Sequence, residues 1–196
     1  LVRALELGTL PVEIDRRADF TAIVPTQLHR ALHGEEKLLS HLQDANSVLV
    51  GGAASSDNLL AQARSAGIHV VTTYGMSEMC GGCIYNGVPL DGVQVQLNDA
   101  GAIQLAGPMQ SMGYLNAPEL WREVTDEKWF TTSDSGEHKD GRWVVTGRLD
   151  DQINSGGKKI SLAVIDNFLH EKFPRQRFAS LAISDSEWGE KLLLAV

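Results

Sequence analysis

Residues 47–78 read SVLVGGAASSDNLLAQARSAGIHVVTTYGMSE, and this segment decides the fold of the chain. It opens with a short β-branched run that breaks at two glycines, which is typical of a buried parallel strand entering a loop. Ser56 and Asp57 can cap a helix over residues 58–66, which Gly67 then ends. Residues 68–73 form a second buried run. This strand–helix–strand order predicts an α/β layer with a parallel sheet.

The pattern of apolar and polar residues changes on both sides of that segment. Upstream, an apolar stretch over residues 19–26 precedes helical spacing at residues 27–33 and 37–42. Downstream, Gly and Asp turns separate short alternating strands, which we expect at residues 93–97, 102–106 and 143–145. Towards the end of the chain, we expect a helix at residues 161–172 and strands at residues 179–184 and 191–196.

We therefore predict three regions. The fold class is α/β, with a parallel-sheet layer, a small β-rich subdomain and the start of a small α+β domain. The expected boundaries are residues 1–87 for part of an α/β N-terminal domain, 88–149 for its β-rich subdomain, and 150–196 for a hinge and a truncated C-terminal domain.

The composition excludes several classes of partner. Of the 196 residues, 43% are hydrophobic and 21% charged, which is an ordinary globular balance. A formal charge of -8 argues against nucleic acid or an anionic membrane as the main partner. No run approaches the ~18 apolar residues of a membrane span, and no signal peptide is evident. We expect a cytoplasmic location. The chain begins without Met and stops in an apolar run, so both ends are interpreted as cuts through a larger protein.

The two cysteines, Cys80 and Cys83, form a C-G-G-C motif. Zinc would need two further ligands, and the six histidines show no complementary spacing. A thioredoxin-like motif should open a helix, but Asn86, Gly87 and Pro89 follow instead. We interpret both cysteines as ordinary loop thiols in a reducing compartment.

Parallel strands present ligand sites at their carboxyl ends, and two strand ends here carry unusual loops. The small residues Gly52, Ala53 and Ala54 would let a flat ring approach the backbone. In the second loop, Tyr74 offers a stacking face for a base. A hydroxyl from Thr73 or Ser77 can contact a phosphate, and the carboxylate of Glu78 can hold Mg²⁺.

A second stretch, TTSDSGEHKDGRWVVTGRLDDQINSGGKKI at residues 131–160, adds groups that suit a ribose. Asp134, expected in a turn before a polar hairpin, can accept from sugar hydroxyls, and Arg148 can donate. Each residue alone has a plainer structural interpretation. Asp134 would be a turn residue, Arg148 a surface ion pair, Tyr74 a packed aromatic and Glu78 a solvated carboxylate.

Taken in order, the motifs resemble those of AMP-forming acyl-CoA synthetases of the adenylate-forming superfamily. TTYGMSE resembles the aromatic-Gly-x-Thr-Glu motif, with Ser77 in place of Thr. TTSD resembles the Thr-Gly-Asp motif, with Ser133 in place of Gly. GRLDDQINSGGKKI resembles the Gly-Arg-x-Asp hinge motif, and LVGGAA the segment beside adenine.

The resemblance implies a role for each matching position. Ser77 and Glu78 would be catalytic, with Glu78 holding Mg²⁺, and Asp150 would be the hinge. Met76, Gly81 and Gly82 would line the acyl pocket, where glycines leave space for an aromatic ring. The nucleotide would contact Gly52, Ala53, Ala54, Thr73, Tyr74, Gly75, Asp134 and Arg148.

The implied reaction joins a carboxylic acid to ATP, forming an acyl-adenylate and pyrophosphate, after which CoA displaces AMP. The substrates would be ATP with Mg²⁺, CoA and a small carboxylic acid. A homodimer is compatible with this interpretation. Residues 24–28 and the run GGCIYNGVPLDGVQV resemble the o-succinylbenzoate–CoA ligases of menaquinone biosynthesis most.

Two parts of the family pattern are not found in these 196 residues: the phosphate loop and the C-terminal catalytic Lys. Lys158 and Lys159 lie in the wrong motif to replace that Lys. The chain alone is therefore expected to be inactive. Two alternatives stay open: an adenylation domain that loads a carrier protein, and a catalytically incomplete nucleotide-binding fragment.

Overall fold

The computed structural model describes residues 18–173, 176 and 178–195 of the chain. The chain divides into two compact units, Leu1–Thr73 and Tyr74–Val196. The division falls within one strand, between Thr73 and Tyr74. The boundaries expected from the sequence, after residues 87 and 149, stay predictions.

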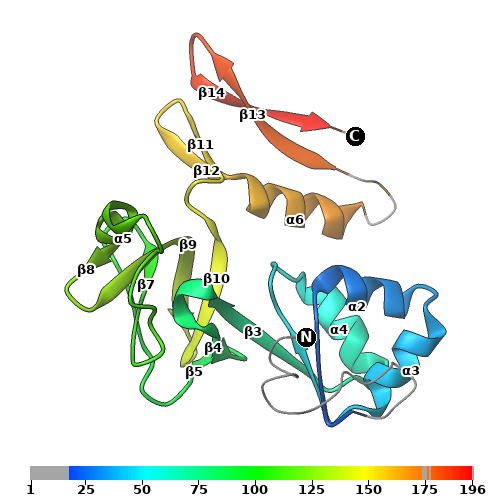
Figure 1. Ribbon diagram of the computed structural model, residues 1–196. Helices are drawn as coiled ribbons and strands as arrows, with labels where there is room; N and C mark the ends of the chain where they lie inside the picture. The colour runs from blue at the N-terminus through cyan, green and yellow to red at the C-terminus, as the bar shows by residue number, and fades with distance from the viewer. Residues whose placement is uncertain (1–17, 174–175, 177, 196) are drawn as a thin grey trace. The chain divides into compact units, whose positions relative to one another are not determined.

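The first unit contains a parallel sheet and three helices (Figure 1). β2 (Ser47–Val50) pairs in parallel with β1 (Phe20–Ile23) and with the beginning of β3 (Val70–Met76). The helices are α2 (Pro25–Leu32), α3 (Glu36–Asp44) and α4 (Asp57–Ser65). Their apolar faces share one core with the strands, in which Leu28, Leu42 and Val48 are fully buried.

The strand–helix–strand segment forms as its sequence predicts. Ser56 is the N-cap of α4, and its hydroxyl accepts from the backbone N–H of Leu59 at 3.2 Å. This bond satisfies one of the donors that a helix leaves unpaired at its first turn. β2 and β3 then lie side by side, which brings their carboxyl ends to one edge of the sheet.

The second unit begins with the end of β3 and contains an antiparallel sheet in the order β10-β9-β7-β6, with β8 beside β9. These strands are β6 (Gln94–Leu97), β7 (Ala102–Ala106), β8 (Thr125–Asp126), β9 (Trp129–Lys139) and β10 (Arg142–Arg148). A short 3₁₀ turn, η1 (Ser77–Met79), leads into β4 (Gly81–Tyr85) and β5 (Val88–Pro89), and α5 (Pro118–Val124) precedes β8. Ile103, Leu105 and Phe130 are buried in the core of this unit.

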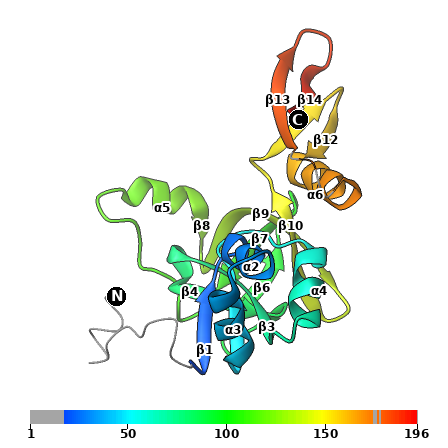
Figure 2. The ribbon, with the colours of Figure 1, turned by 90° about the vertical axis from the view of Figure 1, so that its right-hand side faces the viewer.

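The last segment of the chain forms a second antiparallel sheet with one helix (Figure 2). The sheet order is β12-β11-β14-β13. Its parts are β11 (Gln152–Ser155), β12 (Lys158–Ser161), α6 (Leu162–Lys172), β13 (Ala179–Asp185) and β14 (Gly189–Ala195). Helix α6 packs on β13, and its N-cap is Ser161, whose hydroxyl accepts from the N–H of Val164. The expected fold class is confirmed.

One local expectation is wrong. Asp134 does not lie in a turn, because it is part of the long strand β9. β9 is held between β7 on one side and β10 on the other, and these ladders extend it through the polar run that suggested a turn. In the β9–β10 hairpin, Asp134 is the direct cross-strand partner of Arg148.

The hairpin contains a β-bulge just before Arg148. Val145 pairs with Gly136 and Gly147 pairs with Ser135, so Thr146 is the extra residue. Its hydroxyl lies 3.0 Å from that of Ser135. Bulges bend a strand and change the direction of the side chains that follow. Here the bulge sets the register in which Arg148 meets Asp134.

Candidate functional site

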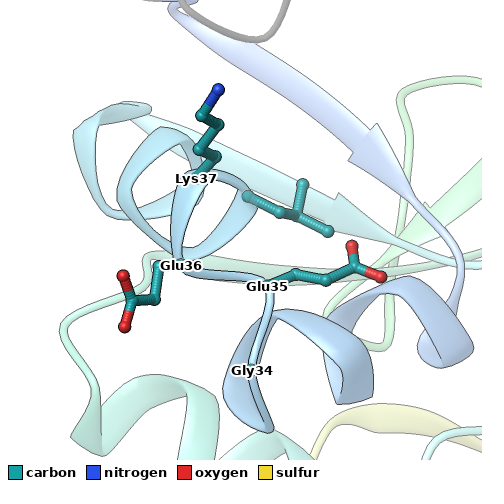
Figure 3. Close-up of a pocket in the computed structure, with 5 residues that line it drawn as sticks. Gly34, Glu35, Glu36 and Lys37 are labelled. Carbon is teal, nitrogen blue, oxygen red and sulfur yellow. The ribbon is translucent and has the colours of Figure 1, made fainter.

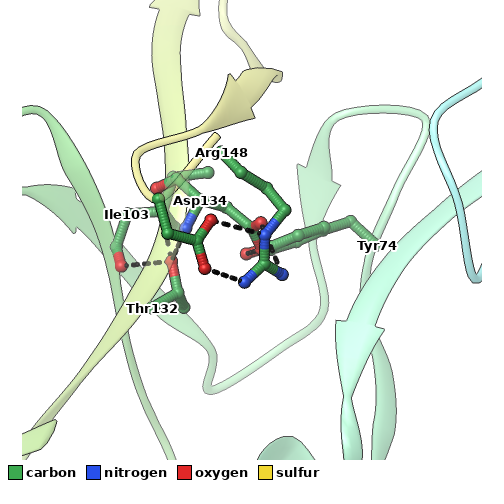
Figure 4. Close-up of polar contacts among 6 residues, drawn as sticks. Tyr74, Ile103, Thr132, Asp134 and Arg148 are labelled. Atoms are coloured by element: carbon green, nitrogen blue, oxygen red, sulfur yellow. Dashed lines mark hydrogen bonds and ion pairs between the residues drawn. The ribbon is translucent and has the colours of Figure 1, made fainter. Parts of the chain in front are cut away.

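The side chains of Tyr74, Asp134 and Arg148 come together in the second unit (Figure 4). The Tyr74 hydroxyl donates to Asp134 Oδ2 at 2.7 Å. Arg148 Nη1 lies 3.9 Å from Asp134 Oδ1. A distant residue of β3 and two cross-strand partners of the β9–β10 hairpin thus meet at one carboxylate.

Thr132 holds the backbone of this cluster in place. Its hydroxyl donates to the carbonyl of Ile103 at 2.9 Å and accepts from the N–H of Asp134 at 3.0 Å. Thr132 is buried, so its hydroxyl needs these partners. No role for Thr132 was expected from the sequence. Its position two residues before the carboxylate, within the TTSD motif, is the signal that could have identified it.

The surroundings of Tyr74 decide which group of the Tyr74–Asp134 pair carries the proton. Burial, and then the hydrogen bond to Asp134, raise the pKa of Tyr74 well above its ordinary value. Tyr74 therefore stays protonated in the neutral range and is the donor of the pair. The carboxylate of Asp134 keeps further acceptor capacity, because each of its oxygens can accept more than one hydrogen bond. This arrangement can accept hydroxyl groups of a sugar.

Arg148 also binds the predicted hinge residue. Its Nε donates to Asp150 Oδ1 at 2.7 Å, and its Nη2 pairs with Asp150 Oδ2. The hydrogen bond from Arg148 is the main cause that lowers the pKa of Asp150. The guanidinium thus lies between two carboxylates, with the two-pronged contact on Asp150 and the longer one on Asp134.

Ser77 and Glu78 lie on η1, directly after β3. The Tyr114 hydroxyl donates to Glu78 Oε1 at 2.8 Å. Tyr114 was not expected from the sequence, because a contact across 36 residues has no local sequence signal. Among the described residues, no group of three or more His, Cys, Asp or Glu side chains could hold a metal ion. One carboxylate nevertheless fits Mg²⁺ that arrives with a nucleotide, since phosphates and water supply its other ligands.

In the first unit, the predicted nucleotide-contacting residues lie at the ends of β2 and β3. Gly52, Ala53 and Ala54 are exposed in the loop after β2. Thr73 lies beside that loop's first residue, because a Cβ on Gly51 would come within 2.1 Å of the Thr73 hydroxyl. The absence of a side chain at residue 51 therefore allows the two strand ends to approach each other.

The glycines after Tyr74 serve close backbone packing. A Cβ on Gly75 would lie 1.8 Å from the carbonyl oxygen of Gly81. A Cβ on Gly82 would lie 2.8 Å from the Tyr85 hydroxyl, and Met76 packs against the core of the unit. The space that the missing side chains leave is therefore taken at Gly75 by the Gly81 carbonyl and at Gly82 by the Tyr85 hydroxyl. The role of Met76, Gly81 and Gly82 in acyl binding stays a prediction.

The two cysteines lie in different environments. Cys80 is exposed, whereas Cys83 is buried in β4. Cys83 is thus not a loop thiol, because its strand contributes it to the core that contains Met79 and Ile84. Burial raises the pKa of Cys83 to about 11. Both thiols are free.

A separate surface pocket lies between α2 and α3 and contains none of the predicted site residues (Figure 3). Its lining is Gly34, Glu35, Glu36, Lys37 and Leu38. These residues are consecutive: Gly34 and Glu35 belong to the connection after α2, and the other three to the first turn of α3. None of the helices in the part of the chain that the structure describes is long and apolar enough to cross a membrane.

Comparison with curated proteins finds similarity along the whole chain. A probable 2-succinylbenzoate–CoA ligase of Mycobacterium tuberculosis (strain CDC 1551 / Oshkosh) is 32% identical over 217 aligned residues, covering 100% of this chain and 56% of the relative. The 2-succinylbenzoate–CoA ligase of Escherichia coli (strain K12) is 29% identical, covering 87% of this chain and 38% of the relative. The chain therefore spans about half the length, or less, of these relatives. No family model matches.

Solved structures are also similar to this chain. E. coli MenE with a bound m phenylether-linked analogue of OSB-AMS is 27% identical, with a TM-score of 0.70 over 90% of this chain and 40% of that one. Bacillus subtilis o-succinylbenzoate CoA synthetase (MenE), in complex with the acyl-adenylate intermediate OSB-AMP, shares the fold with a TM-score of 0.80 at 19% identity, over 98% of this chain and 46% of that one.

Proposed function

We propose that the chain belongs to the adenylate-forming superfamily of AMP-forming acyl-CoA synthetases and is part of an ATP-dependent carboxylate–CoA ligase. The acid would be o-succinylbenzoate, and the pathway menaquinone biosynthesis. The acid carboxylate attacks the α-phosphate of ATP, which releases pyrophosphate and leaves an acyl-adenylate. The thiol of CoA then attacks the acyl carbon and displaces AMP.

The observation that carries this proposal is that Tyr74 and Arg148 both contact the carboxylate of Asp134. A ring face, a hydroxyl acceptor and a guanidinium are the groups that bind the base, ribose and phosphate of AMP. The similarity to 2-succinylbenzoate–CoA ligases supports the choice of acid.

The proposed roles follow from the chemistry of each group. No protein nucleophile is required, so positioning and neutralisation of charge lower the barrier of the first step. Asp134 accepts from the ribose hydroxyls, and Arg148 donates to ribose or phosphate. Ser77 and Thr73 approach the phosphates, and Glu78 holds Mg²⁺, which neutralises charge on the phosphate oxygens. Gly52, Ala53, Ala54 and Gly75 lie against the nucleotide, and Asp150 is the hinge.

Location and assembly belong to the same proposal. The free thiols of Cys80 and Cys83 support a reducing compartment, for which we propose the cytoplasm. A homodimer stays a prediction, and light scattering of the purified protein would test it.

The full-length protein that carries this chain tests the function. With ATP, Mg²⁺ and o-succinylbenzoate it should exchange labelled pyrophosphate into ATP, and with added CoA it should release the thioester. Benzoate, which lacks the succinyl group, is the matched control and should support neither reaction. Exchange without thioester would indicate that the acyl group passes to a carrier protein instead. Binding of ATP without exchange would reduce the assignment to a nucleotide-binding protein.

A further inference from the structure

The turn that carries Ser77 and Glu78 is bound by a loop about thirty-five residues further along the chain. The N–H of Ser111 donates to the carbonyl of Glu78 at 2.8 Å, and the Ser111 hydroxyl donates to the carbonyl of Ser77 at 3.3 Å. These bonds hold the backbone of η1. The third contact, from Tyr114 to Glu78 Oε1, holds the side chain itself.

The ring of Tyr114 has a fixed support. It meets the Trp121 ring edge-on, with centroids 5.2 Å apart and an interplanar angle of 89°. Trp121, on α5, in turn packs against Phe130, with centroids 5.5 Å apart. Phe130 is only 4% exposed and belongs to the core of the second unit. The orientation of the Tyr114 hydroxyl is therefore supported by partly buried ring contacts that lead to the buried Phe130, and not by the loop alone.

The direction of the hydrogen bond is also fixed. The phenol is the donor, and it engages one oxygen of the Glu78 carboxylate, Oε1, at 2.8 Å. Among the described residues, Glu78 Oε2 has no hydrogen-bond partner of its own. That oxygen is the one left to meet a cation.

We propose that Tyr114 is a positioning residue, which orients the Glu78 carboxylate so that Oε2 faces the Mg²⁺ of the bound nucleotide. This inference rests on the proposed function, because it takes Glu78 as the magnesium ligand. A carboxylate that ligates a metal is commonly oriented by a hydrogen bond to its other oxygen, and the loss of such a partner typically costs about 10–100-fold in metal affinity or activity.

Tyr114→Phe in the full-length protein is the main test, because it removes the hydroxyl and keeps the ring against Trp121. The Mg²⁺ concentration that half-saturates ATP binding, measured by calorimetry, should rise about tenfold. AMP affinity, measured without Mg²⁺, should not change. Ser111→Ala is the matched control. It removes one bond from the same loop to η1 but leaves the carboxylate contact, so it should leave the Mg²⁺ requirement unchanged.

A double-mutant cycle with Glu78→Gln separates positioning from a structural role. If Tyr114 acts through the carboxylate, Tyr114→Phe should have no further effect on the Mg²⁺ requirement in the Glu78→Gln background. Additive effects would overturn the proposal, as would an unchanged Mg²⁺ requirement in the single variant. A wild-type protein that binds ATP without any dependence on Mg²⁺ would instead refute the role of Glu78 in the proposed function. Thermal unfolding of each variant shows whether it is folded at the assay temperature.

Discussion

At the scale of single residues, the candidate site depends on one carboxylate. Asp134 accepts from Tyr74, faces Arg148 and receives its backbone position from Thr132. The sequence identified the first three of these residues from their types and their order. It could not supply the contacts, because Tyr74 lies on β3, in a different sheet from β9 and β10, and reaches Asp134 only in the folded chain.

Asp134→Asn should weaken ATP and AMP binding by about 10- to 100-fold, because a hydrogen bond to a charged group contributes about 1.5–3 kcal/mol. The amide oxygen can still accept from Tyr74, so the fold should persist. Calorimetric titration of the full-length variant measures the loss. The matched control is Asp140→Asn, in the exposed turn between β9 and β10. Equal affinities in wild type and Asp134→Asn would contradict the ribose assignment.

The two thiols should differ in reactivity. At pH 8 an aromatic disulfide reagent should modify Cys80 rapidly and Cys83 far more slowly. Burial excludes the reagent from Cys83 and raises its pKa to about 11, so the reactive thiolate is scarce. Denaturation should expose two equivalents. Cys80→Ser should abolish the rapid phase, and a rapid phase that survives in this variant would contradict the burial of Cys83.

At the scale of elements, the strongly patterned segments could be predicted from the sequence and the polar ones could not. β2, α4 and β3 follow from apolar runs, a Ser cap and a terminating Gly. The strand β9 was not predicted at its full length, because its second half is the polar run SDSGEHK. Such a run forms a strand only when its neighbours supply the ladder, and here β10 does so. Likewise, Tyr114 lies in a loop whose partner is 36 residues away.

Gly75→Ala should destabilise the protein by about 3 kcal/mol, the upper end for added bulk in a packed interior. Its Cβ would meet the Gly81 carbonyl oxygen at 1.8 Å, and a backbone atom cannot rotate away. The control is Gly141→Ala, where the added atom meets nothing within 4 Å and only a positive φ of 75° opposes it. That change should cost about 1 kcal/mol. Denaturant unfolding gives both values, and the opposite ranking would refute the close approach.

Asp150→Pro in the full-length enzyme should impair thioester release more than pyrophosphate exchange. We expect residue 150 to absorb backbone rotation between the two half-reactions, and proline fixes φ. The substitution also removes the partner of Arg148. Asp150→Asn is therefore the control, since it weakens this ion pair and leaves the backbone free. Equal losses in both half-reactions would argue against a pivot at Asp150.

At the scale of the whole molecule, the order of motifs carried more information than any one of them. Tyr74, Asp134 and Arg148 have ordinary interpretations when taken singly, and the adenylate-forming assignment came from their succession. The similarity to a probable 2-succinylbenzoate–CoA ligase extends across the full length of the chain. The boundary between the compact units falls inside a continuous strand, β3, and the domain boundaries expected after residues 87 and 149 stay predictions.

AMP should raise the thermal stability of the full-length protein. A ligand that binds only the folded state at about 100 times its Kd adds about 2.7 kcal/mol. Free adenine lacks the ribose that Asp134 is proposed to bind, so at the same concentration it should raise the melting temperature less. Differential scanning calorimetry compares the two ligands. Equal shifts would show that the sugar contributes nothing to recognition.

The extra residue in β10 limits how this hairpin can be altered. If β10 were replaced by a regular strand of equal length, Thr146 would take the place opposite Ser135, and Arg148 would slide to face Ser133. A slip of one residue turns a side chain to the other side of the ribbon, away from Asp134. Anyone who transplants this hairpin into another protein must therefore keep the β-bulge at Thr146. The same sequence forced into a regular strand would lose the pairing of Arg148 with Asp134.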